Sequence, residues 1–243
     1  MPEEIGKAEE KLINKKYHNY GDLTIIKGQW ISGKANQKKI NIYLAWSGWG
    51  KVSAARAATR IISESNKEDP IDMILFTGVA GSANPLNKQW DIILGEKVIQ
   101  HDMDARPLFD QFVIPILKKK YLIANSSLTN FIYENLQNQI KSKNIESFKK
   151  IKRGIIATGD KFINDKKFLE NLCNQIPKLD AVEMEGAAVA QVCEQESIPW
   201  VLIRIISDSA DEAAPLNFNE FIKEYQNKSC EIIESIINCI AYF

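Results

Sequence analysis

Two short stretches decide the fold of this chain: Asp180-Ala-Val-Glu-Met-Glu-Gly186 and Val201-Leu-Ile-Arg-Ile-Ile-Ser-Asp208. The apolar run in the second stretch is typical of a parallel strand that is buried on both faces. Ligands of open α/β sheets bind beyond the carboxyl ends of such strands, which is where Asp208 lies. In the first stretch, Glu183 and Glu185 directly precede a small-residue helix pattern, whose N-terminal dipole favours carboxylates. We therefore expect an acidic site at one edge of an α/β sheet.

The composition of the chain narrows its class. At 243 residues and 45% hydrophobic content, the chain suits one domain, which we expect to span residues 1–243. Its 31 basic and 31 acidic residues cancel, so the balance of charge does not indicate a nucleic-acid partner. The cysteines form no C-x-x-C pair, and no apolar run reaches the roughly 18 residues of a membrane span. We expect a cytoplasmic protein, although a segment ahead of Met1 could carry an export signal.

Apolar periodicity places the other elements. We expect helices at 2–13, 51–62, 128–140, 168–176, 186–193 and 218–240, and strands at 23–26, 29–32, 40–46, 71–76, 90–99 and 154–158. Turn residues between the first three strands favour an antiparallel meander. The later strands alternate with helices, as in a parallel sheet. The predicted fold is a single α/β domain with a central mixed, largely parallel twisted sheet flanked by helices.

Four strand ends carry loops of similar character, rich in glycine, hydroxyl and acidic residues: 47–50, 77–82, 158–163 and 207–211. In one largely parallel sheet these loops gather at the carboxyl edge and line one crevice. The first loop lacks the third glycine of a dinucleotide fingerprint and the lysine-plus-hydroxyl ending of a P-loop, so we predict no cofactor. His101-Asp-Met-Asp104 has no second histidine close by in sequence, so we predict no metal.

The motifs in these loops resemble those of one enzyme family. They are Ser-Gly-x-Gly-Lys-Val at 47–52, Thr-Gly-Val-Ala-Gly at 77–81, His-Asp-x-Asp at 101–104, Gly-Asp-x-Phe-Ile at 159–163, Val-Glu-Met-Glu-Gly at 182–186 and Arg-x-Ile-Ser-Asp at 204–208. Their order and spacing are similar to those of the 5′-methylthioadenosine/S-adenosylhomocysteine nucleosidases, hydrolases of the purine nucleoside phosphorylase superfamily. The likeness extends over nearly the whole chain.

The resemblance implies a role for individual residues. Asp208 matches the general acid that protonates the purine, and Glu4 matches the acid that activates the attacking water. The resemblance places the other positions around the substrate: Glu185 on the ribose hydroxyls, Met184 beneath the sugar, Phe162 and Ile163 at adenine, Gly81 with Val79 and Ser207 at the floor, Glu183 and Arg204 as orienting groups, and Trp49 and Phe218 at the 5′ tail.

The chemistry suits these residue types. Adenine is a poor leaving group as an anion, so its protonation favours cleavage, while the sugar passes through an oxocarbenium-like state. Asp208 can deliver that proton if its surroundings keep it protonated near neutral pH. Glu3 and Glu4 would repel a phosphate nucleophile, which favours hydrolysis over phosphorolysis. A phosphorolytic enzyme on the same fold is the alternative. A third reading is a polyanion-binding surface, such as one for glycosaminoglycan, formed by Lys118–Lys120 and Lys149–Arg153.

The chain differs from the family pattern in places. The family carries a hydrophobic strand directly before Met-x-Glu-Glu, and this sequence starts at that methionine. Trp49 stands where relatives often carry an aliphatic residue, which predicts a preference for short tails such as methylthio. Val79 stands where some relatives carry serine. The resemblance also implies a homodimer whose contacts complete the pocket.

Overall fold

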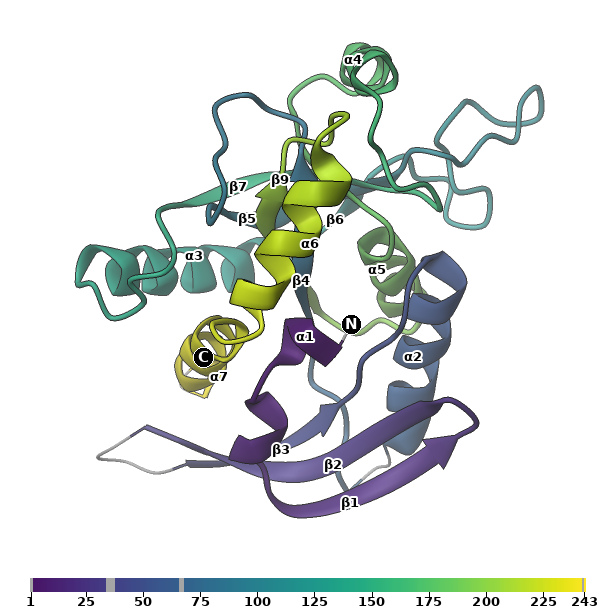
Figure 1. Cartoon of the computed structure of the whole chain (residues 1–243). Coiled ribbons are helices and arrows are strands. Elements are labelled where there is room, and N and C mark those ends of the chain that lie inside the picture. Colours follow the sequence, from purple (N-terminus) through teal and green to yellow (C-terminus); the bar gives the residue numbers. More distant parts are fainter. Residues whose placement is uncertain (1, 34–37, 66–67, 242) are drawn as a thin grey trace.

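The strands form a closed sheet and a separate small sheet. The computed structural model describes residues 2–33, 38–65, 68–241 and 243. The larger sheet has the order β6-β5-β7-β8-β4-β9, and a further β5–β9 pairing closes it into a barrel (Figure 1). Its strands are β4 (Ile74–Ser82), β5 (Ile92–Gln100), β6 (Leu122–Ile123), β7 (Ile151–Thr158), β8 (Leu179–Glu183) and β9 (Trp200–Asp208).

The closure corrects the prediction of a largely parallel sheet. The β4–β9, β5–β7 and β7–β8 pairs are parallel as expected. However, β8 meets β4 in antiparallel fashion at Gly81 and Ser82, and β9 meets β5 in antiparallel fashion at Ile92–Leu94. Every residue of β9 is buried, and its two edges pair with β4 and with β5. A continuous apolar run indicates such burial but does not specify the direction of the neighbouring strands.

The amino-terminal region forms the smaller sheet, an antiparallel meander as expected, although no strand was predicted at 13–20. It consists of β1 (Ile13–Tyr20), β2 (Leu23–Ser32) and β3 (Lys38–Leu44). The predicted strands at 23–26 and 29–32 are one strand that passes through Gly28. A Cβ atom at Gly28 would lie 3.0 Å from Leu12 Cβ and 3.2 Å from the Ile13 carbonyl oxygen. The glycine therefore serves close packing and not a turn.

The predicted helix at 2–13 is wrong. Residues Pro2–Ile5 form a short helix, α1, and Ala8–Lys11 form a 3₁₀ helix, η1. Gly6 separates the two with a φ of 54°, a left-handed conformation that glycine adopts readily.

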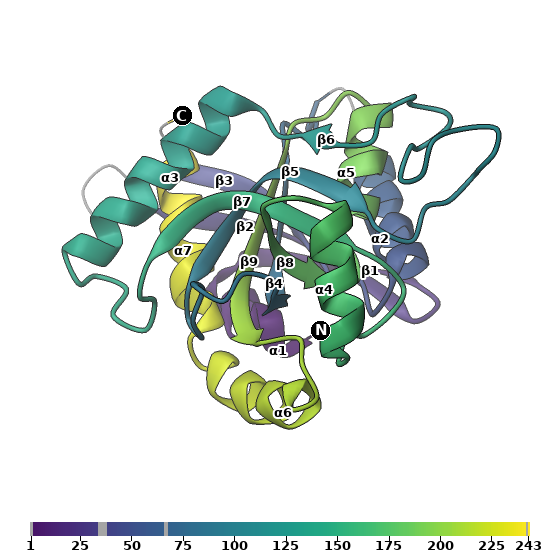
Figure 2. The ribbon, with the colours of Figure 1, turned by 90° about the horizontal axis from the view of Figure 1, so that it is seen from above.

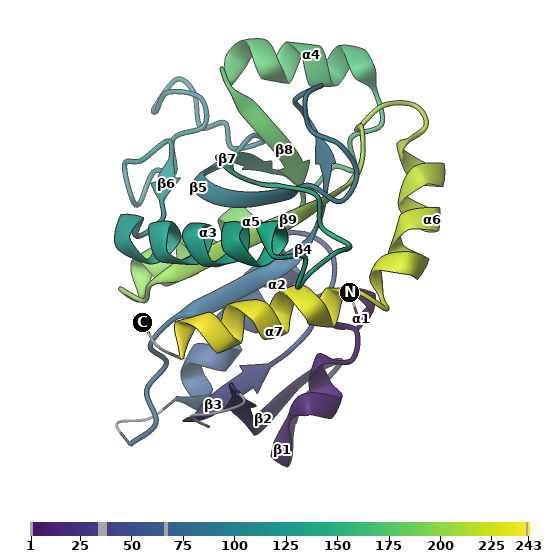
Figure 3. The ribbon, with the colours of Figure 1, turned by 90° about the vertical axis from the view of Figure 1, so that its left-hand side faces the viewer.

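Helices cover both sheets. They are α2 (Lys51–Glu64), α3 (Ser126–Lys141), α4 (Lys166–Gln175), α5 (Gly186–Gln195), α6 (Ala214–Tyr225) and α7 (Ser229–Ile240). Helices α2 and α5 pack side by side, as do α3 and α7 (Figure 2). The predicted closing helix at 218–240 is two helices, because the chain turns at 226–228 and sends α7 along the small sheet (Figure 3). Within the described ranges, no helix is long and apolar enough to cross a membrane.

Candidate active site

One large cavity, of about 630 Å³, opens where the carboxyl ends of β3, β4, β8 and β9 meet. All four predicted segments contribute to it, but residues 77–82 are the carboxyl half of β4 and not a loop after a strand at 71–76, as was expected. It is lined by all of the residues predicted for the site: Glu4, Trp49, Val79, Gly81, Phe162, Ile163, Glu183, Met184, Glu185, Arg204, Ser207, Asp208 and Phe218. Its volume is in the range of small-molecule pockets. The structure therefore brings residues from both halves of the chain into one space.

Asp208 is the last residue of β9 and is 7% exposed. Burial raises the pKa of its carboxyl, because water stabilises the ionised form less well there. Two donors oppose that shift: Ser207 Oγ at 2.7 Å from Oδ2 and the Ala210 N–H at 2.8 Å from Oδ1. A Cβ atom at Gly81 would lie 2.9 Å from Asp208 Oδ1, so glycine gives this carboxyl its room. The carboxyl is thus held in place and biased toward the protonated form.

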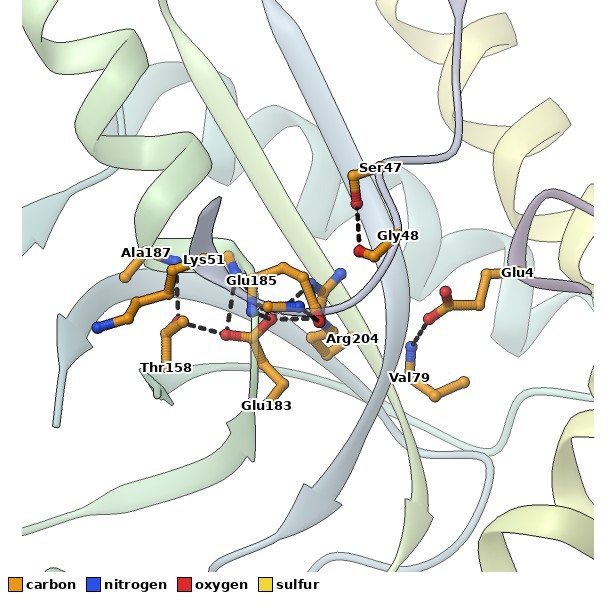
Figure 4. Close-up of polar contacts among 12 residues, drawn as sticks. Glu4, Ser47, Gly48, Lys51, Val79, Thr158, Glu183, Glu185, Ala187 and Arg204 are labelled. Carbon is orange, nitrogen blue, oxygen red and sulfur yellow. Dashed lines mark hydrogen bonds and ion pairs between the residues drawn. The ribbon is translucent and has the colours of Figure 1, made fainter. Parts of the chain in front are cut away.

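Glu183 and Arg204 form an ion pair beneath the cavity, and the two side chains are each 2% exposed. Glu183 Oε2 accepts from Arg204 Nη2 at 2.6 Å and from Nε at 3.1 Å (Figure 4). The same carboxylate accepts from the N–H groups of Glu185 and Gly186, at the start of α5, and contacts Thr158 Oγ1. The N-terminal dipole of α5 adds to the stabilisation of this charge. The pair therefore fixes the base of the site.

Glu185 lies between this ion pair and the loop after β3. Its Oε1 accepts from the Gly50 N–H at 2.9 Å, and its Oε2 lies 3.9 Å from Arg204 Nη2. Burial, and then the negative charge of Glu183, raise the pKa of Glu185 to about 7. The positive charge of Arg204 and the hydrogen bond from the Gly50 N–H lower this pKa, but by less. Glu185 therefore changes its charge close to neutral pH.

Glu4 reaches the site from α1 through the edge of β4. Its Oε1 accepts from the Val79 N–H at 2.9 Å (Figure 4). A Cβ atom at Gly78 would lie 2.4 Å from that oxygen and 2.9 Å from Arg204 Nη1. Glycine at this position lets the carboxylate and the guanidinium approach the same point of the strand. The short amino-terminal helix is thus part of the site.

Aromatic side chains form one wall of the cavity. The rings of Trp49 and Phe162 each lie 5.9 Å from the ring of Phe218, and both contacts are edge-to-face. Trp49 is 49% exposed, so it lies at the mouth and not at the base. Ile163 is buried, and Met184 is half-buried beside Glu183 and Glu185. The wall offers flat apolar surface opposite the charged base.

An ion network that the sequence did not reveal ties the start of α2 to the segments at 101–104 and 158–163. Lys51 Nζ lies 2.6 Å from Asp102 Oδ1, and the Lys51 N–H donates to Asp160 Oδ1 at 2.8 Å. The Asp160 N–H donates in turn to Asp102 Oδ2 at 2.9 Å. These residues lie within the quoted motifs, but their sequence separation gave no signal of the contact. Among the residues the structure describes, no cluster of His, Cys, Asp or Glu is placed to hold a metal.

The two basic clusters are largely engaged by acidic and aromatic neighbours. Lys119 pairs with Glu194, and Lys120 lies over the Phe112 ring. In the second cluster, Lys150 pairs with Asp91, Lys152 pairs with Asp180, and Arg153 lies over the Tyr133 ring. These contacts account for much of the positive charge that the polyanion interpretation requires.

Comparison with known proteins settles the family. The sequence profile of the phosphorylase superfamily matches residues 1–238. The 5′-methylthioadenosine/S-adenosylhomocysteine nucleosidase of Geobacillus kaustophilus is 32% identical over 236 residues, 96% of this chain and 95% of that protein. The chain belongs to the nucleosidases of the phosphorylase superfamily. The family recognised from the motifs is thereby confirmed.

Other relatives of this nucleosidase differ in name and in bound ligand. The aminodeoxyfutalosine nucleosidase of Helicobacter pylori is 33% identical over 197 residues, 81% of this chain and 80% of that protein. Among solved structures, the Neisseria meningitidis methylthioadenosine/S-adenosylhomocysteine nucleosidase in complex with methylthio-immucillin-A has a TM-score of 0.83 at 30% identity, over 98% of this chain and 95% of that one. The nucleosidase of Colwellia psychrerythraea in complex with adenine has a TM-score of 0.84 at 26% identity, over 98% and 92%.

Proposed function

We propose that this nucleosidase hydrolyses the N-glycosidic bond of 5′-methylthioadenosine and S-adenosylhomocysteine, releasing adenine and a thioribose product. One observation carries the proposal: Asp208, with a raised pKa, and Glu4, held on the Val79 N–H, line the same cavity. One group can supply a proton and the other can accept one. The names and bound ligands of the relatives support this choice of substrates.

Asp208 acts as the general acid in this proposal. Because burial favours its protonated form, it can protonate the departing purine, which then leaves as neutral adenine. Breaking the glycosidic bond creates positive charge on the sugar, as in other glycosyl transfers. The proton of Asp208 is consumed at the base and is regained from solvent after adenine leaves.

Glu4 acts as the base that orients and deprotonates the attacking water. The Val79 N–H holds Glu4 Oε1 at the cavity, where the carboxylate can accept a proton from the attacking water. In the same proposal Glu185 binds the ribose hydroxyls, Met184 packs beneath the sugar, and Phe162 stacks on adenine, with Ile163 at the base edge. The ion pair of Glu183 and Arg204 orients these groups, and Gly81, Val79 and Ser207 shape the floor.

Water is favoured over phosphate as the nucleophile. Glu4, Glu183 and Glu185 place three carboxyl groups around a single guanidinium, Arg204, and a phosphate dianion would meet net negative charge. Adenine release from methylthioadenosine, measured with and without phosphate, tests this directly. Equal rates support hydrolysis. Release that requires phosphate, with formation of a sugar phosphate, overturns it in favour of phosphorolysis.

Cleavage of aminodeoxyfutalosine is a second candidate activity, favoured by the 33% identity to the Helicobacter pylori enzyme of that name. A second hollow beside the cavity is lined by Trp49, Phe162 and Phe218 together with Glu3, Asn219 and Ile222. A 5′ substituent that leaves the main cavity would enter it. The values of kcat/KM for aminodeoxyfutalosine, methylthioadenosine and S-adenosylhomocysteine rank the three, and the highest value identifies the preferred substrate.

We also propose that residues 1–243 form one nucleosidase domain and that the protein is a cytoplasmic homodimer. Apolar side chains on the outer face support the homodimer: Val52 is 81% exposed, Leu108 is 84% exposed and Ile116 is 72% exposed. Burial of such residues between two copies would stabilise the pair. Sedimentation of the protein tests this, and a monomer at micromolar concentration would contradict it.

Polyanion binding is the least supported role, and loss of heparin binding near physiological salt would mark it as nonspecific.

A further inference from the structure

The second hollow adjoins the cavity of the active site, and aromatic rings form the wall between the two spaces. The side chains of Trp49, Phe162 and Phe218 border both. The rings of Trp49 and Phe162 each lie 5.9 Å from the ring of Phe218, so the wall is a single layer of rings. In the proposed function, the 5′ substituent of the nucleoside lies at this wall. We call the second hollow the tail hollow, because a long 5′ substituent would enter it.

The tail hollow carries a single negative charge. Of the described residues that line it, Glu3 of α1 alone is charged. Glu4, the next residue of α1, lines the active-site cavity instead. Successive residues of a helix point about 100° apart, so α1 presents one carboxyl group to each space. The tail hollow therefore favours a ligand group that carries a positive charge.

The main chain fixes the position of Glu3 beside α6. Helix α1 packs against α6 and α7 (Figure 1). Ser229 Oγ, at the start of α7, donates to the Glu3 carbonyl oxygen at 3.3 Å. A Cβ atom at Gly6 would lie 2.5 Å from the Gln226 carbonyl oxygen, so glycine permits this close approach. The short helix is thus held against the turn between α6 and α7, next to the residues of α6 that line the tail hollow.

The Glu3 carboxylate is available to a ligand. Its side chain is half-buried, and in the described part of the chain no ion pair or hydrogen bond involves this carboxylate. The Glu4 carboxylate, in contrast, accepts from the Val79 N–H. A partly buried carboxylate interacts more strongly with a cation than an exposed one, because water screens the charges less. S-adenosylhomocysteine carries an ammonium group on its 5′ tail, and methylthioadenosine carries none.

We propose that the tail hollow binds the amino-acid end of S-adenosylhomocysteine and that Glu3 selects this substrate by pairing with its ammonium group. The inference rests on the proposed function, because the 5′ end of the nucleoside must lie at the ring wall. Asn219 also lines the tail hollow, and its amide N–H can donate to the carboxylate of the same tail. Glu3 determines specificity and takes no part in cleavage of the bond.

Cleavage of three nucleosides by the whole protein tests the proposal. They are methylthioadenosine, S-adenosylhomocysteine and N-acetyl-S-adenosylhomocysteine, which lacks the ammonium charge. The measured quantity is kcat/KM of each longer nucleoside divided by that of methylthioadenosine. In Glu3→Gln, which keeps the size of the side chain, we expect this ratio to fall about tenfold for S-adenosylhomocysteine and to stay the same for the N-acetyl derivative. Added salt should lower the first ratio in the parent protein more than in the variant.

Glu220→Gln is the matched control. It removes one negative charge from an exposed neighbour of Asn219 that does not line the tail hollow, so both ratios should stay the same. An unchanged ratio for S-adenosylhomocysteine in Glu3→Gln overturns the proposal. An equal fall for the N-acetyl derivative also overturns it, because the ammonium would then be irrelevant. An equal fall in Glu220→Gln overturns direct pairing in favour of the general surface charge.

The parent protein separates a failure of this inference from a failure of the proposed function. Adenine release from methylthioadenosine, without release from S-adenosylhomocysteine, overturns the inference and leaves the hydrolysis of methylthioadenosine intact. Absence of release from both nucleosides refutes the proposed function, and the inference with it.

Discussion

Replacing Arg204 with methionine removes the positive charge beneath the site and leaves Glu183 buried. The two side chains are each 2% exposed, and their closest atoms are 2.6 Å apart. Removal of one partner of a buried ion pair typically costs about 3–5 kcal/mol, because the remaining charge loses its compensation. The donors at the start of α5 still reach Glu183, which favours the lower part of this range. For a chain of this length each kcal/mol lowers Tm by about 2–4 °C, so we expect a drop of about 6–20 °C.

Urea unfolding followed by tryptophan fluorescence measures this loss. The midpoint should fall while the slope stays unchanged, as expected when the folded structure is retained. The double variant Arg204→Met with Glu183→Gln should lose less stability than the sum of the single variants, because the second change removes the uncompensated charge. Arg56→Met is the matched control: its partner Asp22 is 89% exposed, so the midpoint should hardly move.

A decrease of less than about 1 kcal/mol in the free energy of unfolding of Arg204→Met, the value typical of an exposed ion pair, would refute a strong contribution from this pair. Additive losses in the double variant would also contradict it, because they would show that the two side chains act independently in spite of their contact.

Two further predictions concern Glu185 and Trp49. Since the pKa of Glu185 is raised from 4.5 to about 7, its favourable contribution to stability is present below pH 4.5 and is lost as the pH rises through 7. The free energy of unfolding should therefore depend less on pH in Glu185→Gln than in the parent protein over this interval. The same slope in both proteins would contradict the raised pKa of Glu185. If the ionised form binds the ribose, kcat/KM of the parent protein should also fall below about pH 7. Trp49→Leu should raise kcat/KM for S-adenosylhomocysteine relative to methylthioadenosine by about tenfold, because it widens the mouth beside Phe218; an unchanged ratio would remove Trp49 from substrate selection.

The positions that line the site could largely be predicted from the sequence. Most of these positions lie at the carboxyl end of a predicted strand or at the start of a predicted helix. Such positions gather at one edge of an α/β sheet, whether the sheet is open or closed. Glu183 and Glu185 at the start of α5 are an example, since their position depends on a local helix pattern. Glu4 is different, because only the resemblance placed it in the site.

The features that the sequence did not reveal depend on contacts between distant segments. The closure of the barrel depends on β9 meeting β5, and an apolar run gives no information about its neighbours. Gly28 indicated a turn by composition but permits contact with Leu12. Gly6, which ends α1, was overlooked within an otherwise amphipathic pattern. The network of Lys51 and Asp102 joins loops that are far apart in the chain.

The most direct test of Asp208 as the general acid uses the variant Asp208→Asn. Its turnover of methylthioadenosine is measured together with its binding of an adenine-containing inhibitor, on the same preparation. Asparagine keeps the shape of the side chain but has no carboxyl proton to deliver to the purine. We expect adenine release to fall by at least about 10²-fold while inhibitor binding and thermal stability stay close to those of the parent protein. Near-normal turnover in this variant would contradict the account.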